Sequence, residues 1–228
     1  VSRFDQEFAK TTAENLTTIK KEYPYLFPEQ YSDSVWIAKT KDTIQQELNT
    51  EVERAFPNFN TETKDLELLF KHIKYYFPKF PIPKVITLTS DVRYDNRVIL
   101  ADSLLLIGLD NYLGKDHKFY KGFQNYIATG LDKQFLISDV ASEFCGQVMP
   151  YQKGRTFLDQ MIYYGKELYL KDKLMPFDSE EHRILYTPEQ LEWARANEEQ
   201  IWRYFVEREL LYSSDRQLQA RFLDPAPL

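Results

Sequence analysis

The sequence has 228 residues, of which 43% are hydrophobic and 28% are charged, a balance that is typical of a folded globular protein and excludes general disorder. The formal net charge is −6, which argues against nucleic-acid binding because a duplex-binding protein needs a cationic surface to displace counterions from phosphates. The single cysteine cannot form an internal disulfide, and no stretch approaches the roughly 20 apolar residues that span a bilayer.

Helical periodicity dominates the first part of the chain. Residues 33–56 are predicted to form one helix that Pro57 ends, with an apolar stripe made of Ile37, Ile44, Leu48, Val52 and Phe56. A second helix is predicted to begin near Thr61, where threonine is a suitable N-cap. Its apolar face follows the i, i+3, i+4, i+7 pattern through Leu66, Leu69, Phe70, Ile73 and Phe77.

The hydrophobic period changes after three prolines, Pro78, Pro81 and Pro83, which end helical structure. Residues 84–89 are predicted to form a strand, and residues 98–100 and 103–113 are rich in β-branched residues and leucine. Residues 101 and 102 could form a turn or a bulge between the last two segments. The connections are too short for a crossover helix, so the sequence predicts a small antiparallel sheet.

Helices resume after Gly130. They are predicted over residues 131–149, 155–174, about 179–185, 188–212 and 215–222, and residues 224–227 end the ordered pattern. The helix at 188 has the clearest start, with Thr187 as N-cap, Pro188 at the first position and Gln190 completing a capping box. We therefore expect one predominantly helical α+β domain: helical over 1–80, strands over about 84–113, and helical over 131–222.

The side chains that usually carry chemistry are scattered. The three histidines, His72, His117 and His182, lack a second ligand at a tight spacing, so exposed or ion-paired histidines are expected rather than metal ligands. There is no Gly-x-Ser-x-Gly motif, and Cys145 lies in an apolar helix, where a buried and inert thiol is expected. No catalytic residue, metal ligand or cofactor is assigned.

The helix predicted over 131–149 is the one segment whose side chains are spaced like a functional motif. Asp139, Glu143 and Gln147 share a face, and Ser138, Ser142 and Gly146 form an adjacent stripe of small residues. The simplest interpretation is close helix packing with the carboxylates facing water. The alternative compares residues 142–146 with the His-Glu-x-x-His helix of zinc peptidases, in which Glu143 has the general-base position while Ser142 and Gly146 replace both histidines. The resulting candidate is a vestigial pocket of six residues, Asp110, Asp139, Ser142, Glu143, Cys145 and Gly146.

Several longer segments are idiosyncratic. They are Val-Ser-Arg-Phe-Asp-Gln-Glu-Phe at 1–8, Tyr-Pro-Tyr-Leu-Phe-Pro at 23–28, Leu-Ile-Gly-Leu-Asp-Asn-Tyr-Leu-Gly at 106–114, the helix around 139–147, residues 186–215 and residues 221–227. Together they resemble the gliding-motility lipoprotein GldB family of Bacteroidetes over essentially the whole chain.

The resemblance implies a lipid-anchored envelope protein that faces the periplasm or the cell surface, with a role in gliding motility and the associated secretion machinery. It also implies an outer-membrane lipid anchor on a cysteine upstream of Val1, which this chain does not include, and a C-terminal segment beyond residue 227. Family members are distantly similar to predicted zinc-dependent peptidases, which implies a degenerate zincin-like fold. The family offers no established catalytic residues to carry over.

Three hypotheses follow. The first is a non-catalytic domain that binds other envelope proteins of the gliding and secretion apparatus, for which Tyr163, Tyr164, Tyr169 and Trp193 are candidate surface aromatics. The second is an atypical hydrolase that uses Glu143 with Asp110 or another carboxylate. The third is a module that binds peptidoglycan or another glycan by stacking Tyr and Trp on sugar rings.

Overall fold

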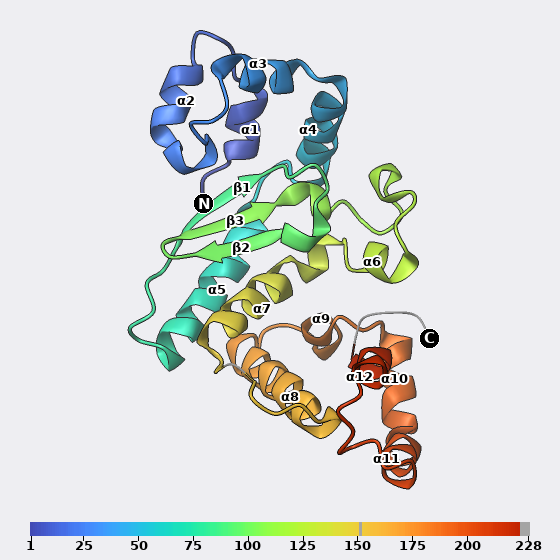
Figure 1. The fold of residues 1–228 in the computed structure, drawn as a ribbon. Helices are drawn as coiled ribbons and strands as arrows, with labels where there is room; N and C mark the ends of the chain where they lie inside the picture. The colour runs from blue at the N-terminus through green and yellow to red at the C-terminus, as the bar shows by residue number, and fades with distance from the viewer. Residues whose placement is uncertain (151, 224–228) are drawn as a thin grey trace. The chain divides into compact units, whose positions relative to one another are not determined.

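A computed structural model describes residues 1–150 and 152–223 (Figure 1). It is mostly helical with one small sheet, which confirms the α+β class. The chain divides into two compact units, the first made of Val1–Lys64 with Pro81–Leu113 and the second of Asp65–Phe80 with Gly114–Leu228. The long helix α5, Asn60–Tyr76, contributes to both. The expectation of a single domain stays a prediction.

The sheet of the first unit has three strands, β1 (Lys84–Leu88), β2 (Val98–Ala101) and β3 (Leu104–Gly108), in the order β1-β3-β2. β2 and β3 pair antiparallel around a turn in which Asp102 has φ 47°. β1 and β3 pair parallel, so the prediction of an antiparallel sheet is wrong for this pair. The connection from β1 to β3 contains β2 itself, and this reversed strand brings the chain back in the original direction without a crossover helix.

Four short helices precede the sheet: α1 (Phe4–Ala9), α2 (Leu16–Glu22), α3 (Asp33–Lys41) and α4 (Thr43–Ala55). A 3-10 turn, η1 (Pro24–Leu26), follows α2. Before α1, Ser2 bridges to Ile86 in parallel and extends the sheet at the outer edge of β1. The Ser2 N–H donates to the Val85 carbonyl at 2.8 Å, and the Ser2 carbonyl accepts from the Thr87 N–H at 3.0 Å.

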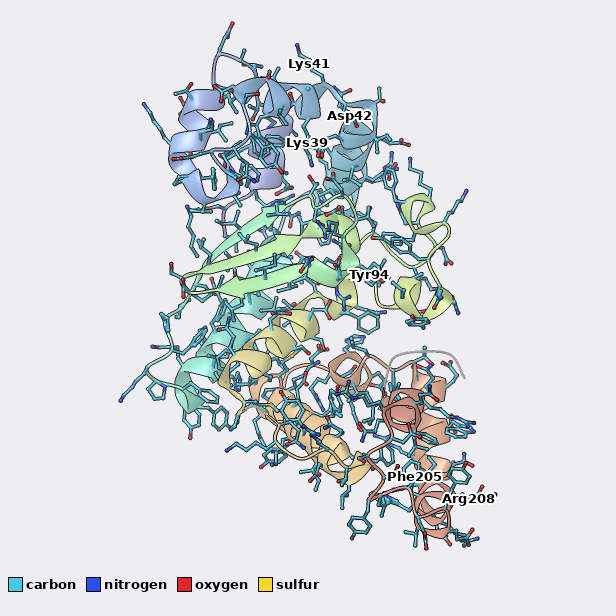
Figure 2. The ribbon with its side chains drawn as sticks, viewed as in Figure 1. Lys39, Lys41, Asp42, Tyr94, Phe205 and Arg208 are labelled. Carbon is cyan, nitrogen blue, oxygen red and sulfur yellow. The ribbon has the colours of Figure 1, made fainter. Side chains whose placement is uncertain are left out.

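The single helix predicted over residues 33–56 is wrong, because Asp42 divides it into α3 and α4. Asp42 is extended, with φ −66° and ψ 131°, and its side chain accepts a hydrogen bond from the Gln45 N–H as the N-cap of α4. Figure 2 labels Asp42 next to Lys39 and Lys41 at this break. The break turns Ile44 away from the expected stripe and leaves it 65% exposed, while Leu48 and Val52 remain buried.

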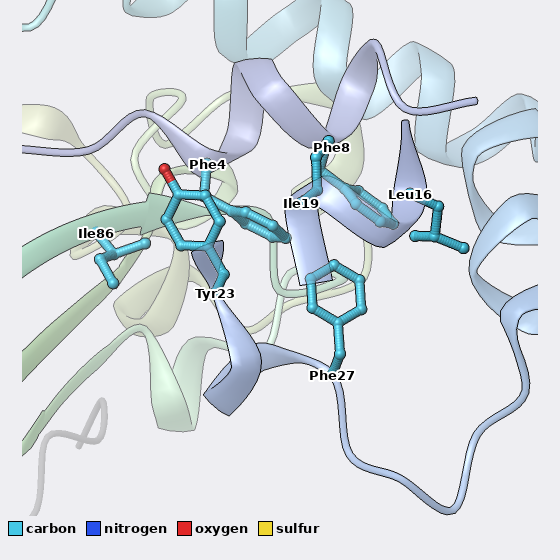
Figure 3. Close-up of a cluster of buried hydrophobic side chains, with 7 residues drawn as sticks. All are labelled: Phe4, Phe8, Leu16, Ile19, Tyr23, Phe27 and Ile86. Carbon is cyan, nitrogen blue, oxygen red and sulfur yellow. The ribbon is translucent and has the colours of Figure 1, made fainter. Parts of the chain in front are cut away.

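Aromatic rings hold the N-terminal helices on the sheet (Figure 3). Seven buried side chains form this cluster: Phe4, Phe8, Leu16, Ile19, Tyr23, Phe27 and Ile86. The rings of Phe4 and Tyr23 lie 5.0 Å apart at a tilt of 58°, a favourable aromatic geometry. The Tyr23 hydroxyl donates to Glu7 at 2.8 Å, so its polar end is satisfied inside the cluster. Ile86 is the contribution of β1, and the cluster therefore ties the helices to the sheet.

The second unit contains, after residues 65–80, a series of helices, of which Phe157–Leu174 is the longest. They are η4 (Lys118–Tyr120), α6 (Asn125–Thr129), η5 (Lys133–Phe135), α7 (Leu136–Val148), α8 (Phe157–Leu174), α9 (Glu180–Ile184), α10 (Pro188–Ala196), α11 (Glu198–Glu207) and α12 (Arg216–Leu223). The capping box predicted at Thr187 and Gln190 is confirmed. The single helix predicted over 188–212 is wrong: Asn197, with φ −108° and ψ 7°, ends α10, and its side chain donates to the Trp193 carbonyl. Residues 224–227, predicted to end the ordered pattern, lie outside the described residues.

The core of the second unit is built on α7 and on the residues at the start of α8. Leu136, Val140 and Phe144 of α7 are buried, and the Phe144 ring contacts the rings of Phe77 and Phe80 at 5.1 and 4.8 Å. Phe157 at the start of α8 packs on Phe205 of α11 and Phe222 of α12. In the part of the chain that the structure describes, no helix is long and apolar enough to cross a bilayer.

Candidate functional site

The residues of the predicted vestigial pocket do not share one environment. On α7, Asp139 and Cys145 are buried, Ser142 is half-buried, and Glu143 and Gly146 are exposed. Asp110 follows β3 and belongs to the first unit, whereas the other five residues belong to the second. The interpretation of α7 as a packing helix with carboxylates facing water therefore fits Glu143 but not Asp139.

A residue that the sequence did not single out, Lys171 of α8, meets α7 at Ser142. Its side chain is 2% exposed, and its Nζ donates to the Ser142 Oγ at 3.1 Å. Burial lowers the pKa of Lys171, and the nearby charges of Asp139 and Glu167 oppose that shift. The Lys-Asp-Lys run at 171–173 is typical of a solvated helix end, so only the packing of α8 on α7 reveals this lysine as buried.

Cys145 is fully buried, as its apolar neighbours predicted. Burial, with a smaller contribution from Glu167, raises the pKa of its thiol to about 12. The thiol is therefore protonated at neutral pH, and the thiolate that would act as a nucleophile is not formed.

The histidines occupy three separate environments. His72 lies 6.0 Å from the Phe177 ring, and the His117 Nδ1 accepts from the Phe119 N–H. The His182 Nδ1 lies 2.8 Å from the Asp178 Oδ1, and the expectation of exposed or ion-paired histidines stays a prediction. Over residues 1–150 and 152–223, no three His, Cys, Asp or Glu side chains are grouped in a way that could hold a metal ion.

Asp110 instead organises a turn at the carboxyl ends of β1 and β3. It lies in the 3-10 turn η3 (Leu109–Asn111) and is completely buried. Its two carboxylate oxygens accept from the Ser90 N–H at 2.9 and 3.0 Å, from the Val92 N–H at 2.6 Å and from the Ser90 hydroxyl at 3.2 Å. Burial raises the pKa of Asp110, and the hydrogen bonds from Val92 and Ser90 oppose this shift.

This turn is strained. Asp91 and Val92 both have φ 56°, a conformation that a β-branched residue rarely adopts. The fit around Ser90 is tight, because a Cβ added at Gly108 would lie 2.7 Å from its hydroxyl oxygen. The Asn111 amide donates to the Ser90 hydroxyl at 2.8 Å. The Thr-Ser-Asp run at 89–91 indicates a loop, but without a glycine nothing in the sequence predicts the left-handed conformation at Val92.

Three of the four candidate surface aromatics are exposed. Tyr164, Tyr169 and Trp193 have exposed fractions of 44%, 66% and 62%, whereas Tyr163 is half-buried and its ring lies 5.7 Å from that of Tyr164. The Lys173 Nζ lies over the Tyr169 ring, 4.9 Å from the ring centroid, in a cation–π contact. Tyr163, Tyr164 and Tyr169 belong to α8, and Trp193 belongs to α10.

A comparison with protein families gives a match to the family described as gliding motility protein GldB, over residues 1–228. The chain belongs to the GldB family. This assignment confirms the resemblance seen in the sequence and links the chain to gliding motility. Comparisons with curated proteins and with solved structures found no match.

The family is designated a lipoprotein family, so this GldB-family chain is part of a motility-related envelope protein. None of the site residues described above is given a role by the match.

Proposed function

We propose that this GldB-family chain is a non-catalytic domain that serves gliding motility by binding another envelope protein of the motility and secretion apparatus. The proposal places the contact on α8. It also places the protein in Bacteroidetes, lipid-anchored and facing the periplasm or the cell surface, as its resemblance to the family implies.

The observation that carries the proposal is an apolar surface on α8. Ile162 and Leu168 are 48% and 42% exposed, beside Tyr164 at 44% and Tyr169 at 66%. Ile162 and Tyr169 are spaced i, i+7 and Tyr164 and Leu168 are spaced i, i+4, so they form two pairs that lie roughly 130° apart around the helix axis, on either side of Gly165. Tyrosine is enriched among the residues that dominate binding energy.

Gly165 lies between these side chains and supports a protein partner. A Cβ added there would meet nothing within 4 Å, so no contact inside the chain requires glycine. In the middle of a helix, glycine costs about 0.5–1 kcal/mol relative to alanine. A gap of this kind lets a partner backbone approach the helix closely, with Tyr164 and Tyr169 on either side.

The surroundings of α7 support a non-catalytic role. The Ser142 hydroxyl is engaged by Lys171, and Gly146 offers no side chain at the second position where a zinc peptidase has histidine. The buried Cys145 thiol stays protonated. Glu143 is exposed, which suits a surface residue better than a general base in a closed site.

The proposal is tested by photo-crosslinking in gliding cells. A photoreactive amino acid is placed at Tyr169 or Leu168, and the matched control is Glu199 on α11, whose side chain is 86% exposed. We expect one discrete protein adduct from the two α8 positions and none from position 199. Crosslinking of all three positions to the same material, or of the α8 positions only to isolated cell wall, would contradict protein binding through α8.

A loss-of-function variant completes the test. Leu168→Asp with Tyr169→Asp places two charges on the patch without changing a buried residue. We expect this variant to be folded and present at normal abundance, yet to lose the adduct and to glide poorly. Normal gliding by the charged variant would show that α8 is not the contact.

A further inference from the structure

A separate hollow lies in the first unit, where β1 and β3 end. Its volume is about 420 Å³, which is within the range of small-ligand sites. Leu88, Ile99 and Leu106 give it an apolar side. Ile99 and Leu106 are cross-strand partners and therefore lie next to each other on one face of the sheet. Ile99 is 40% exposed, so this apolar side is open to a ligand.

Two cationic side chains, Lys39 from α3 and Arg93 from the end of the turn, line the hollow together with the carboxylate of Asp91, so the charges on its wall sum to +1. Lys39 Nζ pairs with Asp91 at 2.8 Å, and this pair is partly exposed. The Arg93 guanidinium lies 4.0 Å from Asp95, and both side chains are more than half exposed. Exposed pairs of this kind are weak, so both cations can turn to an anionic ligand, and arginine can hold a carboxylate through two hydrogen bonds.

The wall between these two cations is rigid. Asp91 and Val92 keep their left-handed conformation because the buried Asp110 accepts from the N–H groups of Ser90 and Val92. These N–H groups point to Asp110 and not to the hollow, so the lysine and arginine side chains supply the attraction for an anion. A wall that is ordered before binding removes much of the ordering cost that a flexible loop would add.

We propose that this hollow binds the C-terminal end of a peptide whose last residue is apolar. The terminal carboxylate lies between Lys39 and Arg93, and the last side chain packs on Ile99 and Leu106. The polar walls, which include Asn96 and Thr89, suit the peptide groups of the preceding residue. A hollow of this size holds a dipeptide end better than a long acyl chain. This site is independent of α8, so either proposal can fail without the other.

The test is a titration of the whole chain, labelled with ¹⁵N, followed by NMR. N-acetyl-L-leucine is the probe, because it joins a carboxylate to an apolar amino acid. N-acetyl-L-leucine amide keeps the side chain and removes the charge, and sodium decanoate represents a fatty acid. We expect saturable shifts at the backbone amides of residues 89–93 and 99 with the acid. N-acetyl-L-leucine amide should bind roughly tenfold more weakly, since it lacks the charge that strengthens the hydrogen bonds to Lys39 and Arg93.

Charge variants locate the effect. Lys39→Gln and Arg93→Gln should each weaken the acid several-fold, while Lys41→Gln, the same charge change at an exposed position of the same helix (Figure 2), should not. Equal binding of acid and amide, shifts outside the hollow, or equal weakening by Lys41→Gln would overturn the proposal. Tighter binding of decanoate than of N-acetyl-L-leucine at residues 89–93 and 99 would also overturn it, because the ligand would then be a lipid.

Discussion

The Asp110 carboxylate accepts a 2.6 Å hydrogen bond from the backbone N–H of Val92, a residue whose φ of 56° is rare for a β-branched side chain. A left-handed non-glycine residue costs roughly 1–3 kcal/mol and persists only when its surroundings enforce it. Here the completely buried Asp110 carboxylate stabilises this conformation, because it accepts hydrogen bonds from the N–H groups of both Ser90 and Val92. The turn at the end of β1 therefore depends on a residue that follows β3.

Asp110→Asn tests this dependence. An amide presents one oxygen where the turn needs two acceptors, and its NH₂ group faces a backbone N–H. We expect a loss of about 1–3 kcal/mol in the free energy of unfolding, the usual cost of leaving a buried polar group unsatisfied. Urea unfolding of both proteins at neutral pH measures it. Glu53→Gln, the same carboxyl-to-amide change at an exposed position of α4 in the same unit, is the control and should change little. An equal stability of the asparagine variant would show that the turn does not depend on Asp110.

The same variant exposes a pH dependence. Burial raises the pKa of Asp110 in the folded chain above its ordinary value of 3.8. The pH-dependent part of its contribution to stability is therefore fully present below that value and is lost as the pH rises through the folded-state pKa, while the hydrogen bonds from Ser90 and Val92 remain. The stability of the native chain minus that of Asp110→Asn should be largest in acid and should decrease with rising pH. Subtracting the two stabilities cancels the pH dependence that the other carboxylates contribute to both proteins. A difference that grows with pH would show that the pKa of Asp110 is lowered and not raised.

Local signals in the sequence were sufficient for some elements. The apolar face of α5 was predicted because Leu66, Leu69, Phe70 and Ile73 follow the helical period, and these residues are buried. The start of α10 was predicted because Thr187, Pro188 and Gln190 act within a single turn. Predictions of this kind need only the nearest neighbours along the chain.

Features that depend on distant residues were missed. The parallel pairing of β1 with β3 follows from the spatial order of the strands in the sheet, β1-β3-β2, and not from the length of a connection. The helix breaks at Asp42 and Asn197 were missed for a different reason: their caps are local, but the helical periodicity of the apolar residues continues across them. The burial of Lys171 depends on α7, and the turn at Val92 depends on Asp110. The six-residue pocket failed as a unit because its five members on α7 differ in burial and Asp110 belongs to the other unit.

Lys171→Met is expected to destabilise the second unit. The substitution keeps most of the side-chain volume but removes the ammonium group that faces Ser142 and the charge of Asp139, itself buried. Removing the ammonium group takes away the buried hydrogen-bond partner of the Ser142 hydroxyl, which costs about 1–3 kcal/mol. Lys173→Met is the matched control, since that lysine is 41% exposed, and it should change the free energy of unfolding by less than about 0.5 kcal/mol. Equal effects from the two variants, measured by urea unfolding, would show that Lys171 makes no special contribution.

Cys145 should resist thiol reagents in the folded protein. It is the only cysteine in the chain, so any modification detected by mass or absorbance reports on this residue alone. Its burial and a pKa of about 12 leave almost no thiolate at neutral pH. We expect modification to proceed at the rate of unfolding and to become fast in denaturant. Rapid stoichiometric reaction of the native chain would show that α7 opens on the time scale of the experiment.

Glu143→Ala separates binding from catalysis most directly. Glu143 is exposed on α7, so the variant should fold normally, and a non-catalytic chain should support gliding at the native rate. Phe144→Ala is the adjacent comparison. It removes a side chain that is 1% exposed and contacts two other rings, at a cost of about 3–5 kcal/mol, and motility should fall with the amount of folded protein. Both strains are scored for gliding and for abundance of the chain. Loss of gliding with abundant, folded Glu143→Ala protein would assign that carboxylate a functional role and favour a hydrolase over a binding domain.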